Sequence, residues 1–322
     1  MKYATRINSF KQSPYYKDQN LSTINVINLI SQIDGITDIE LNFPQAFEGS
    51  TIPKIKDAVK NAGLKVSGVA LRYEHIFENG EFTNPDEKIR QKAIQMTKDA
   101  VDVCRQLGGS VTTIWTANDG FDYPFQINYN DAWDKTVDAL KRVTTAYPDN
   151  KISFEYKPYE PRTFSLIEGI SSTLLLEDEV GAKNLGVTLD FCHMLMKREN
   201  PAYSLALAAR KHRLLGFHLN DGQGNTDDGL MLGTVHLLET LEFIYYAKKY
   251  HYDEVNYFDT FPIRENPIKE CQQNVEMYKR LSNFIDDLGL DEIDSLINSQ
   301  DGLSVQRKLL LNLLNNHDMS HN

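Results

Sequence analysis

Four strand-like segments of the chain end in side chains that can bind a divalent cation. They are ISFEYK with Glu155, NLGVTLD with Asp190, LLGFHL with His218 and VNYFD with Asp259. Carboxylate oxygens together with one imidazole form an oxygen and nitrogen ligand set suited to such a cation. Burying three carboxylates together is costly without a cation or shared protons, so the pattern favours a metal site. The alternative is a hydrogen-bonded polar rim that holds no metal.

Further polar residues follow the same segments and extend the candidate chemistry. The loop after His218 reads NDGQGNTDDGL and holds three acids, Asp221, Asp227 and Asp228, while His193 lies three residues after Asp190. Together these side chains could hold a second cation beside the first, or they are ordinary structural groups. Lys157 lies two residues beyond Glu155 on the same strand face. It could hold a substrate oxygen, or it forms a salt bridge to Glu155.

The elements that must position these residues follow from hydrophobic periodicity, because short apolar runs alternate with longer segments of helical spacing. The expected strands are residues 3–8, 38–42, 65–71, 110–115, 151–156, 185–190, 214–219 and 255–259. The expected helices are residues 21–33, 51–62, 85–107, 129–146, 164–180, 201–211, 235–250 and 267–286. Eight strand–helix units predict an α/β fold of the (β/α)8 TIM barrel type. The four ligands would then lie at the carboxyl ends of the fifth to eighth strands, where such barrels have their active sites.

The repeat predicts two regions. Residues 1–287 would form the TIM barrel catalytic domain, and residues 288–322 would form a C-terminal helical extension that packs on the barrel or on another subunit. At the borders, Asn200 followed by Pro201 is typical of a helix start. Gly63, Gly108 and Gly181 fall where helices hand over to strands, at positions that favour a left-handed cap.

Composition excludes several classes of function. The net charge is -11, and no basic block occurs that could bind a phosphate backbone, so we expect no nucleic-acid partner. The three cysteines are widely separated and odd in number, which argues against a disulfide framework and favours a reducing cytoplasm. The N-terminus lacks the apolar core of a secretory signal, and no apolar stretch is long enough to span a bilayer. We therefore expect a cytoplasmic protein without a membrane partner.

Five segments carry a resemblance to a known family: EYKPYEPR, LDFCH, GFHLND, IWTANDGFDYPFQ and YFDTFP. They resemble the xylose isomerase-like TIM barrel superfamily over roughly residues 1–285, and most closely its bacterial rhamnose isomerase-like and xylose isomerase-like sugar isomerases. The resemblance implies one or two divalent metals per subunit, Mn²⁺ first, with Mg²⁺ or Co²⁺ as alternatives. It implies as metal ligands Glu155, Asp190, His218, Asp259, His193 and Asp228.

The resemblance also implies an activity, the interconversion of an aldose and a ketose at C1 and C2 of an open-chain monosaccharide. The enzyme would be a metal-dependent intramolecular oxidoreductase. In the ketose 3-epimerases of the superfamily, a glutamate usually stands where this chain has Asp259. The shorter side chain favours the isomerase. A ketose 3-epimerase, a metal-dependent polyol dehydratase or lyase, and a non-catalytic sugar-binding barrel are the alternatives.

Roles for individual residues complete the prediction. The expected catalytic residues are Lys157, Glu155, Asp259 and His75, the last for opening the sugar ring. The expected substrate contacts are Trp115, His193, Arg162, Glu40 and Phe43. Further candidates for hydroxyl or anion contacts are Arg6, Asn8, Asp119 and Arg264. Arginine can bind an acidic group bidentately, so a charged sugar derivative stays open beside the simpler neutral monosaccharide. We expect a homodimer or homotetramer.

Overall fold

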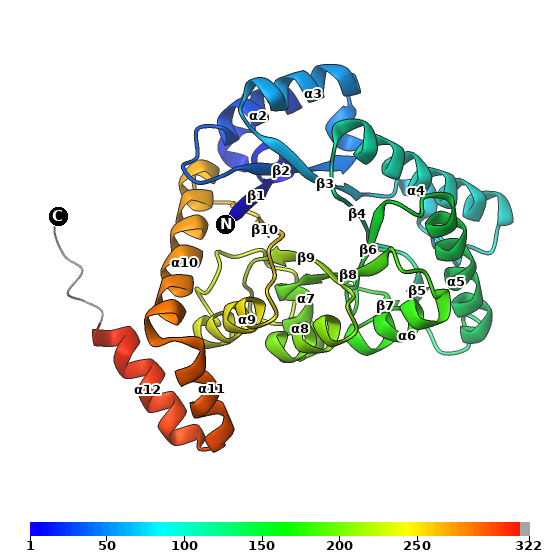
Figure 1. The fold of residues 1–322 in the computed structure, drawn as a ribbon. Helices are drawn as coiled ribbons and strands as arrows, with labels where there is room; N and C mark the ends of the chain where they lie inside the picture. Colours follow the sequence, from blue (N-terminus) through cyan, green and yellow to red (C-terminus); the bar gives the residue numbers. More distant parts are fainter. Residues whose placement is uncertain (316–322) are drawn as a thin grey trace.

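The computed structural model describes residues 1–315 and shows a closed barrel of parallel strands surrounded by helices (Figure 1). In order around the barrel, the strands are β1 (Lys2–Arg6), β10 (Val255–Phe258), β9 (Leu214–Leu219), β8 (Leu185–Asp190), β6 (Lys151–Glu155), β4 (Val111–Ile114), β3 (Lys65–Leu71) and β2 (Asp38–Phe43). The pairing of β1 with β2 closes the ring. The predicted TIM barrel is therefore confirmed.

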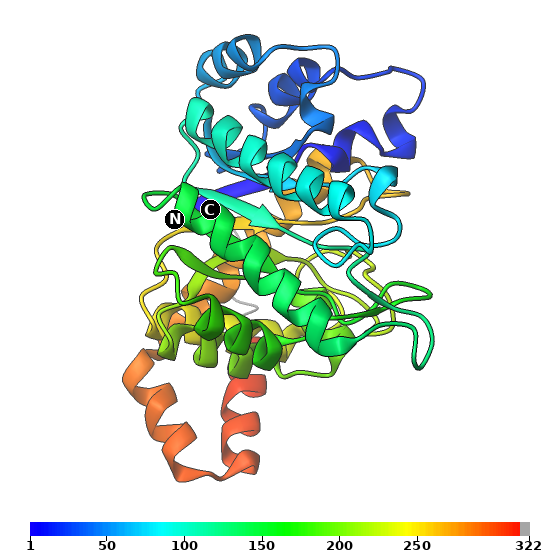
Figure 2. The ribbon, with the colours of Figure 1, turned by 90° about the vertical axis from the view of Figure 1, so that its right-hand side faces the viewer.

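Helices wrap the outside of the barrel, and the last two project from it as a pair (Figures 1 and 2). The helices are α1 (Asn8–Lys11), α2 (Thr23–Ile30), α3 (Ile52–Asn61), α4 (Glu87–Leu107), α5 (Tyr129–Ala146), α6 (Ile170–Val180), α7 (Phe191–Lys197), α8 (Pro201–Arg210), α9 (Leu237–Lys249), α10 (Pro267–Leu288), α11 (Leu290–Ser299) and α12 (Gly302–Asn315). Short 3₁₀ helices occur at Pro14–Tyr16, Gln45–Phe47 and His75–Phe77.

All eight predicted barrel strands are present, and the main differences from prediction have local causes. The first strand ends at Arg6, because Ile7 already has helical backbone angles and α1 starts at Asn8. The helix expected at residues 164–180 begins only at Ile170. Its first residues instead form the short strand β7 (Phe164–Ser165), which pairs with β5 (Gly120–Phe121). Pairing between segments distant in sequence is not visible in local periodicity.

The strands are buried on both faces because helices cover one face, which is apolar, and the barrel interior lies behind the other. Ile39, Val69, Leu189 and Phe258 have no exposed surface. The predicted helix borders also hold, since Gly108 and Gly181 cap α4 and α6 in the left-handed conformation. At the start of α8, the side chain of Asn200 accepts a hydrogen bond from the Tyr203 amide. These caps fix where the helices begin and end. Together with the packing, they therefore fix where the strands between the helices end.

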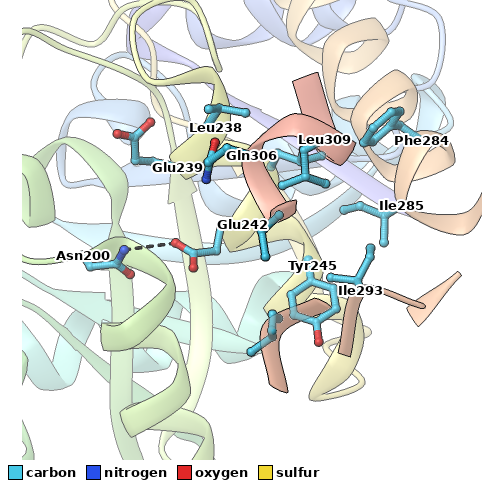
Figure 3. Close-up of a pocket in the computed structure, with 13 residues that line it drawn as sticks. Asn200, Leu238, Glu239, Glu242, Tyr245, Phe284, Ile285, Ile293, Gln306 and Leu309 are labelled. Carbon is cyan, nitrogen blue, oxygen red and sulfur yellow. Dashed lines mark hydrogen bonds between the residues drawn. The ribbon is translucent and has the colours of Figure 1, made fainter. Parts of the chain in front are cut away.

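Beyond the barrel, α11 and α12 enclose a largely apolar cavity of about 320 Å³ together with α9 and α10. Tyr245, Phe284, Ile293 and Leu309 line it, and a hydrogen bond from Asn200 to Glu242 lies at its edge (Figure 3). The cavity lies away from the metal-ligand candidates. Treating this region as an extension separate from a domain of residues 1–287 stays a prediction, and residues 316–322 lie outside the described part.

The cysteines Cys104, Cys192 and Cys271 are buried and form no disulfide with one another. Within the described residues 1–315, no helix combines the length and apolar character needed to cross a membrane.

Glu177 on α6 makes the stability of the barrel depend on pH. It has no exposed surface, neither carboxylate oxygen has a hydrogen-bond partner among the described residues, and the Nε of Arg213 lies 3.8 Å away. Burial raises the pKa of Glu177 to about 8, an effect that Arg213 opposes. The folded protein therefore keeps this proton where the unfolded chain has already lost it.

We expect stability to fall as pH rises from about 5 to 8, by at most about 1.4 kcal/mol per pH unit from this group, because the unfolded chain binds fewer protons there. Glu177→Gln should match the unsubstituted protein near pH 5 and exceed it in stability near pH 8. Urea unfolding at both pH values measures this, with Glu276→Gln on the exposed face of α10 as the control. If Glu177→Gln changed the free energy of unfolding equally at both pH values, Glu177 would not be a buried neutral carboxyl.

Candidate functional site

The four predicted ligands meet at the mouth of the barrel. Glu155 ends β6, Asp190 ends β8, His218 lies on β9 and Asp259 directly follows β10, and these strands are neighbours in the sheet. One ligand atom from each side chain lies within 4.8 Å of the others. All four are buried, at 2 to 3% exposure. The strand register makes this possible, since His218 pairs with Asp190 on one side and with Tyr257 on the other.

His218 is held with one ring nitrogen toward the acids and the other toward the opposite wall. Its Nδ1 lies 3.1 Å from Glu155 Oε1 and 3.8 Å from Asp259 Oδ2. Its Nε2 lies 3.5 Å from Glu40 Oε1, which reaches in from β2. An imidazole that binds metal through one nitrogen usually directs its other N–H to a carboxylate or carbonyl oxygen, and this fixes the tautomer. Glu40 lies where it would give His218 this support, and its predicted role as a substrate contact stays a prediction.

The donor set fits a cation. Among the described residues, His218 Nδ1, Asp259 Oδ1 and Glu40 Oε1 are buried without a hydrogen-bond partner. Buried polar atoms are nearly always partnered, so such a cluster of orphans needs an explanation. A divalent metal bound by Glu155, Asp190, His218 and Asp259 would satisfy the ligand atoms and balance their charge.

Asn220 organises two of the ligands, and the sequence analysis did not single it out. Its side-chain amide donates to Asp190 Oδ2 at 3.0 Å and to the Asp259 carbonyl at 3.1 Å, while its oxygen accepts from the Cys192 amide at 2.8 Å. The residue has no exposed surface. A possible signal was its place two residues after His218, at the end of the same segment.

A second group of ligands lies beside the first and consists of Asp190, His193 and Asp227. The Nδ1 of His193 lies 2.9 Å from the Tyr156 carbonyl, which can only accept, so Nδ1 carries the hydrogen. Its Nε2 then faces Asp227 Oδ2 at 3.2 Å. The predicted ligand Asp228 instead accepts hydrogen bonds from the Gln223 amide and the Thr226 hydroxyl within its own loop. Asp227 is the better placed of the two acids.

Charge coupling within the site shifts its pKa values in opposite directions. Burial favours a neutral Glu155, but His218, His193 and Arg72 lower its pKa to about 2. Burial raises the pKa of Asp190 to about 7, with His193 opposing the shift and neighbouring acids adding to it. Burial lowers the pKa of His193, but Asp190 and Asp227 outweigh it and raise that pKa to about 9. Bound protons thus offset part of the repulsion between the buried carboxylates.

Lys157 lies on the rim of this site and does not pair with Glu155. Its Nζ lies 2.8 Å from Glu160 Oε1, 3.4 Å from Asp227 Oδ2 and 5.1 Å from the centre of the Trp115 ring. It is 8% exposed. Burial lowers its pKa, but the two acids outweigh this and raise it above its ordinary value, so the ammonium stays charged.

A cavity of about 500 Å³ reaches the second ligand group, since Asp227 lines it. It is built by residues at or after the ends of strands β1, β2, β3, β4, β9 and β10, among them Arg6, Gln45, Arg72, Trp115 and Phe261. Arg6 Nη1 lies 3.4 Å from Asp259 Oδ1 and so joins the cavity wall to the ligand group. Trp115, an expected substrate contact, lines this cavity, and its role stays a prediction.

Other predicted residues lie apart from this centre. The His75 side chain is fully exposed and has Glu78 as its neighbour at 3.5 Å. The Arg162 side chain is 71% exposed and pairs with Asp122. Phe43 packs against Phe47, with ring centres 6.0 Å apart. The carboxylate of Asp119 accepts the amides of residues 81–83, so it holds a loop together. The roles proposed for His75, Arg162 and Phe43 stay predictions that this geometry does not support.

Comparison with known proteins places this geometry in context. Residues 28–281 match the model of the xylose isomerase-like TIM barrel family. A probable sugar isomerase from Rhizobium meliloti is 28% identical over 48% of this chain and 36% of its own length. A xylose isomerase from Thermus thermophilus is 24% identical over 66% of this chain and 57% of its own length. The chain thus matches less than two thirds of the length of these curated relatives.

Among solved structures, a D-allulose 3-epimerase from Methylomonas sp. in complex with D-allulose superposes with a TM-score of 0.70. It is 19% identical, and the match covers 87% of this chain and 96% of the other. At that identity the likeness shows the shared fold.

The protonated site predicts that metal affinity rises with pH. The metal-free protein holds protons near neutral pH because the pKa of Asp190 is raised to about 7 and the pKa of His218 well above its ordinary value, by Glu155 and Glu40 against burial. A cation must displace such protons. Calorimetric titration with Mn²⁺ should therefore show proton release and an affinity that increases from pH 6 to 9.

In the same titration, Asp190→Asn should weaken binding by about tenfold or more. Asp178→Asn on the outer face of α6 serves as its control. Binding without proton release, or full affinity in Asp190→Asn, would contradict the site.

Proposed function

The chain belongs to the xylose isomerase-like TIM barrel family, and from that membership we propose that it is a divalent-metal-dependent sugar isomerase. It would interconvert an aldose and a ketose at C1 and C2 of an open-chain monosaccharide. The observation that carries the proposal is the buried ligand group next to Lys157, beside a cavity of sugar size. Relatives named sugar isomerase and xylose isomerase support it.

Glu155, Asp190, His218 and Asp259 would hold one metal, and His193 with Asp227 would share Asp190 for a second. Mn²⁺ is the metal we propose first, because an oxygen-rich set with one or two imidazoles suits it as well as Mg²⁺ or Co²⁺. When bound, the metal supplies Lewis-acid stabilisation of the negative charge that develops on the sugar oxygens.

Side chains of the protein would supply the other catalytic interactions. The charged Lys157 lies over the Trp115 ring. It would donate a hydrogen bond to the substrate oxygen at C1 as negative charge develops there. Asp227 faces both Lys157 and His193, so this carboxylate would hold the Lys157 ammonium toward the substrate. Glu155 and Asp259, the other predicted catalytic residues, would act on a carbon-bound proton in an enediol route. A direct hydride shift would leave them as ligands only.

A ketose 3-epimerase is the second candidate, favoured by the superposition on the allulose epimerase. Its chemistry needs a carboxylate that reaches the carbon at C3. Asp259 is short, and it lies between Arg6 at 3.4 Å and His218 at 3.8 Å. This confinement suits a ligand better than a mobile base. A homo-oligomer and a cytoplasmic location stay predictions.

Incubation with aldoses and ketoses in Mn²⁺ buffer, followed by NMR of the products, tests the proposal. We expect aldose–ketose pairs to equilibrate, and we expect chelation by EDTA to stop the reaction and Mn²⁺ to restore it. Ketose-to-ketose conversion without an aldose would instead identify an epimerase, and loss of water would identify a dehydratase. Binding without conversion of any sugar would contradict the enzyme assignment.

Lys157→Met should keep the metal and lower kcat by about 100-fold, because it removes a charged donor to the developing oxyanion. The exposed Lys54→Met on α3 provides a control with the same change of charge. Metal content and kcat are measured on the same preparations. Normal turnover by the Lys157 variant would assign this lysine to structure alone.

A further inference from the structure

We propose that the cavity is built for an acidic sugar, one that carries an oxyanion outside C1 and C2, and that Arg72 and Arg6 bind this oxyanion. The inference rests on the proposed function for its site and deepens it by naming the substrate class. The shared chemistry is a carboxylate, phosphate or sulfonate group, each of which offers oxygen atoms to a guanidinium fork.

Arg72 is the main observation, and the sequence analysis did not single it out. It directly follows β3 and lines the cavity with its guanidinium 4.6 Å from the centre of the Trp115 ring. Its Nε is buried, and its side chain has no hydrogen-bond or ion-pair partner within residues 1–315. A buried N–H donor without an acceptor is unfavourable unless a ligand or water accepts from it. A group at the cavity with two acceptor oxygens would satisfy this fork.

Arg6 repeats the arrangement from the end of β1. Its guanidinium lies 4.5 Å from the centre of the Phe261 ring, and its Nε is also buried without a partner among the described residues. Only Nη1 approaches an acid, at 3.4 Å from Asp259 Oδ1. Both guanidinium groups therefore lie over an aromatic ring, and both have a buried Nε–H without an acceptor. A stacked guanidinium is held in one plane, which favours a planar, bidentate contact.

The charge around the cavity supports an anionic group. The protein as a whole is acidic, with a net charge of -11. The cavity lining nevertheless contains two arginines and a single carboxylate, Asp227. That carboxylate is already paired with His193 at 3.2 Å and with Lys157 at 3.4 Å. The remaining polar lining consists of amides and hydroxyls, such as Asn8, Ser13 and Gln45. Such a surface attracts an anion despite the sign of the whole molecule.

A purely structural role for the arginines would be to neutralise the carboxylates of the ligand group. Arg6 can do so through Asp259, and the charge of Arg72 acts on Glu155 from a distance, but the Arg72 side chain forms no ion pair or hydrogen bond within residues 1–315 that would use its donors. It also lies on the same indole ring as Lys157, which we place at the reacting end of the sugar. Arg72 is therefore within reach of a substrate group and is the residue on which the test depends.

Binding of polyols tests the inference without any turnover. Sorbitol, L-gulonate, which carries a carboxylate at the C6 end of the sorbitol chain, and sorbitol 6-phosphate are titrated calorimetrically into the Mn²⁺-loaded protein. We expect at least one acidic polyol to bind about 10- to 100-fold more tightly than sorbitol, as hydrogen bonds to a charged group provide. Arg72→Met should abolish this excess, and Arg72→Lys should keep only part of it. Arg105→Met, an exposed site on α4, is the control with the same change of charge.

The sugars glucose, glucuronate, glucose 6-phosphate and 6-deoxy-6-sulfoglucose then identify the acidic group from their relative kcat/KM. Equal binding of sorbitol and both acidic polyols, with no preference in the sugar set, would overturn the inference. If a folded Arg72→Met protein still bound acidic polyols more tightly than sorbitol, the preference would come from the metal. That result would also overturn the inference. Tight binding of acidic polyols without turnover of any sugar would contradict the isomerase but leave the anion site standing. Turnover of neutral sugars alone would support the isomerase but contradict the anion site.

Discussion

The central constraint on this molecule is the burial of three carboxylates and an imidazole in one small volume. Water is excluded from Glu155, Asp190, His218 and Asp259, so their charges interact strongly and must be compensated within the site. Protons can provide this compensation, which is why the pKa values of Asp190 and His193 are raised. A divalent cation would provide it better, because it would bind the same atoms directly. Much of the surrounding structure serves to hold the four groups together.

The barrel meets this constraint by combining rigid strands with a few buried supports. Parallel strands place their carboxyl ends at one edge, and the register of β8, β9 and β10 brings His218 level with Asp190 and beside Asp259. Asn220 then ties Asp190 to the Asp259 backbone, and Glu40 reaches across from β2 to the far side of His218. Asp190 also caps α7 by accepting the His193 amide, which orients that histidine toward Asp227. One side chain thus belongs to the helix start and to both ligand groups.

The proposed reacting groups and the proposed substrate-binding groups lie in neighbouring parts of the site. The metal-ligand candidates lie at the ends of the strands, Lys157 pairs with Asp227 beside them, and the two arginines line the cavity wall. Trp115 connects these parts, since both Lys157 and Arg72 lie over its ring. A sugar held across this indole would meet a metal at one end and a guanidinium at another. Selectivity would then arise from the wall residues, which differ in chemistry from the ligand group beside them.

Local sequence features were enough to predict the barrel and the four side chains that meet at its mouth. Hydrophobic periodicity and the side chains at the ends of successive strands are local features, and the topology of parallel strands brings them to a shared location. Which loop residues lie beside those four side chains became visible only in the folded chain. Asp227 and not Asp228 faces His193, and His75 points to solvent, because loop geometry depends on contacts with other segments. The roles of Arg72 and Asn220 also depend on folding. An unpartnered guanidinium and a bridging amide can be recognised only from their neighbours, which come from distant parts of the chain.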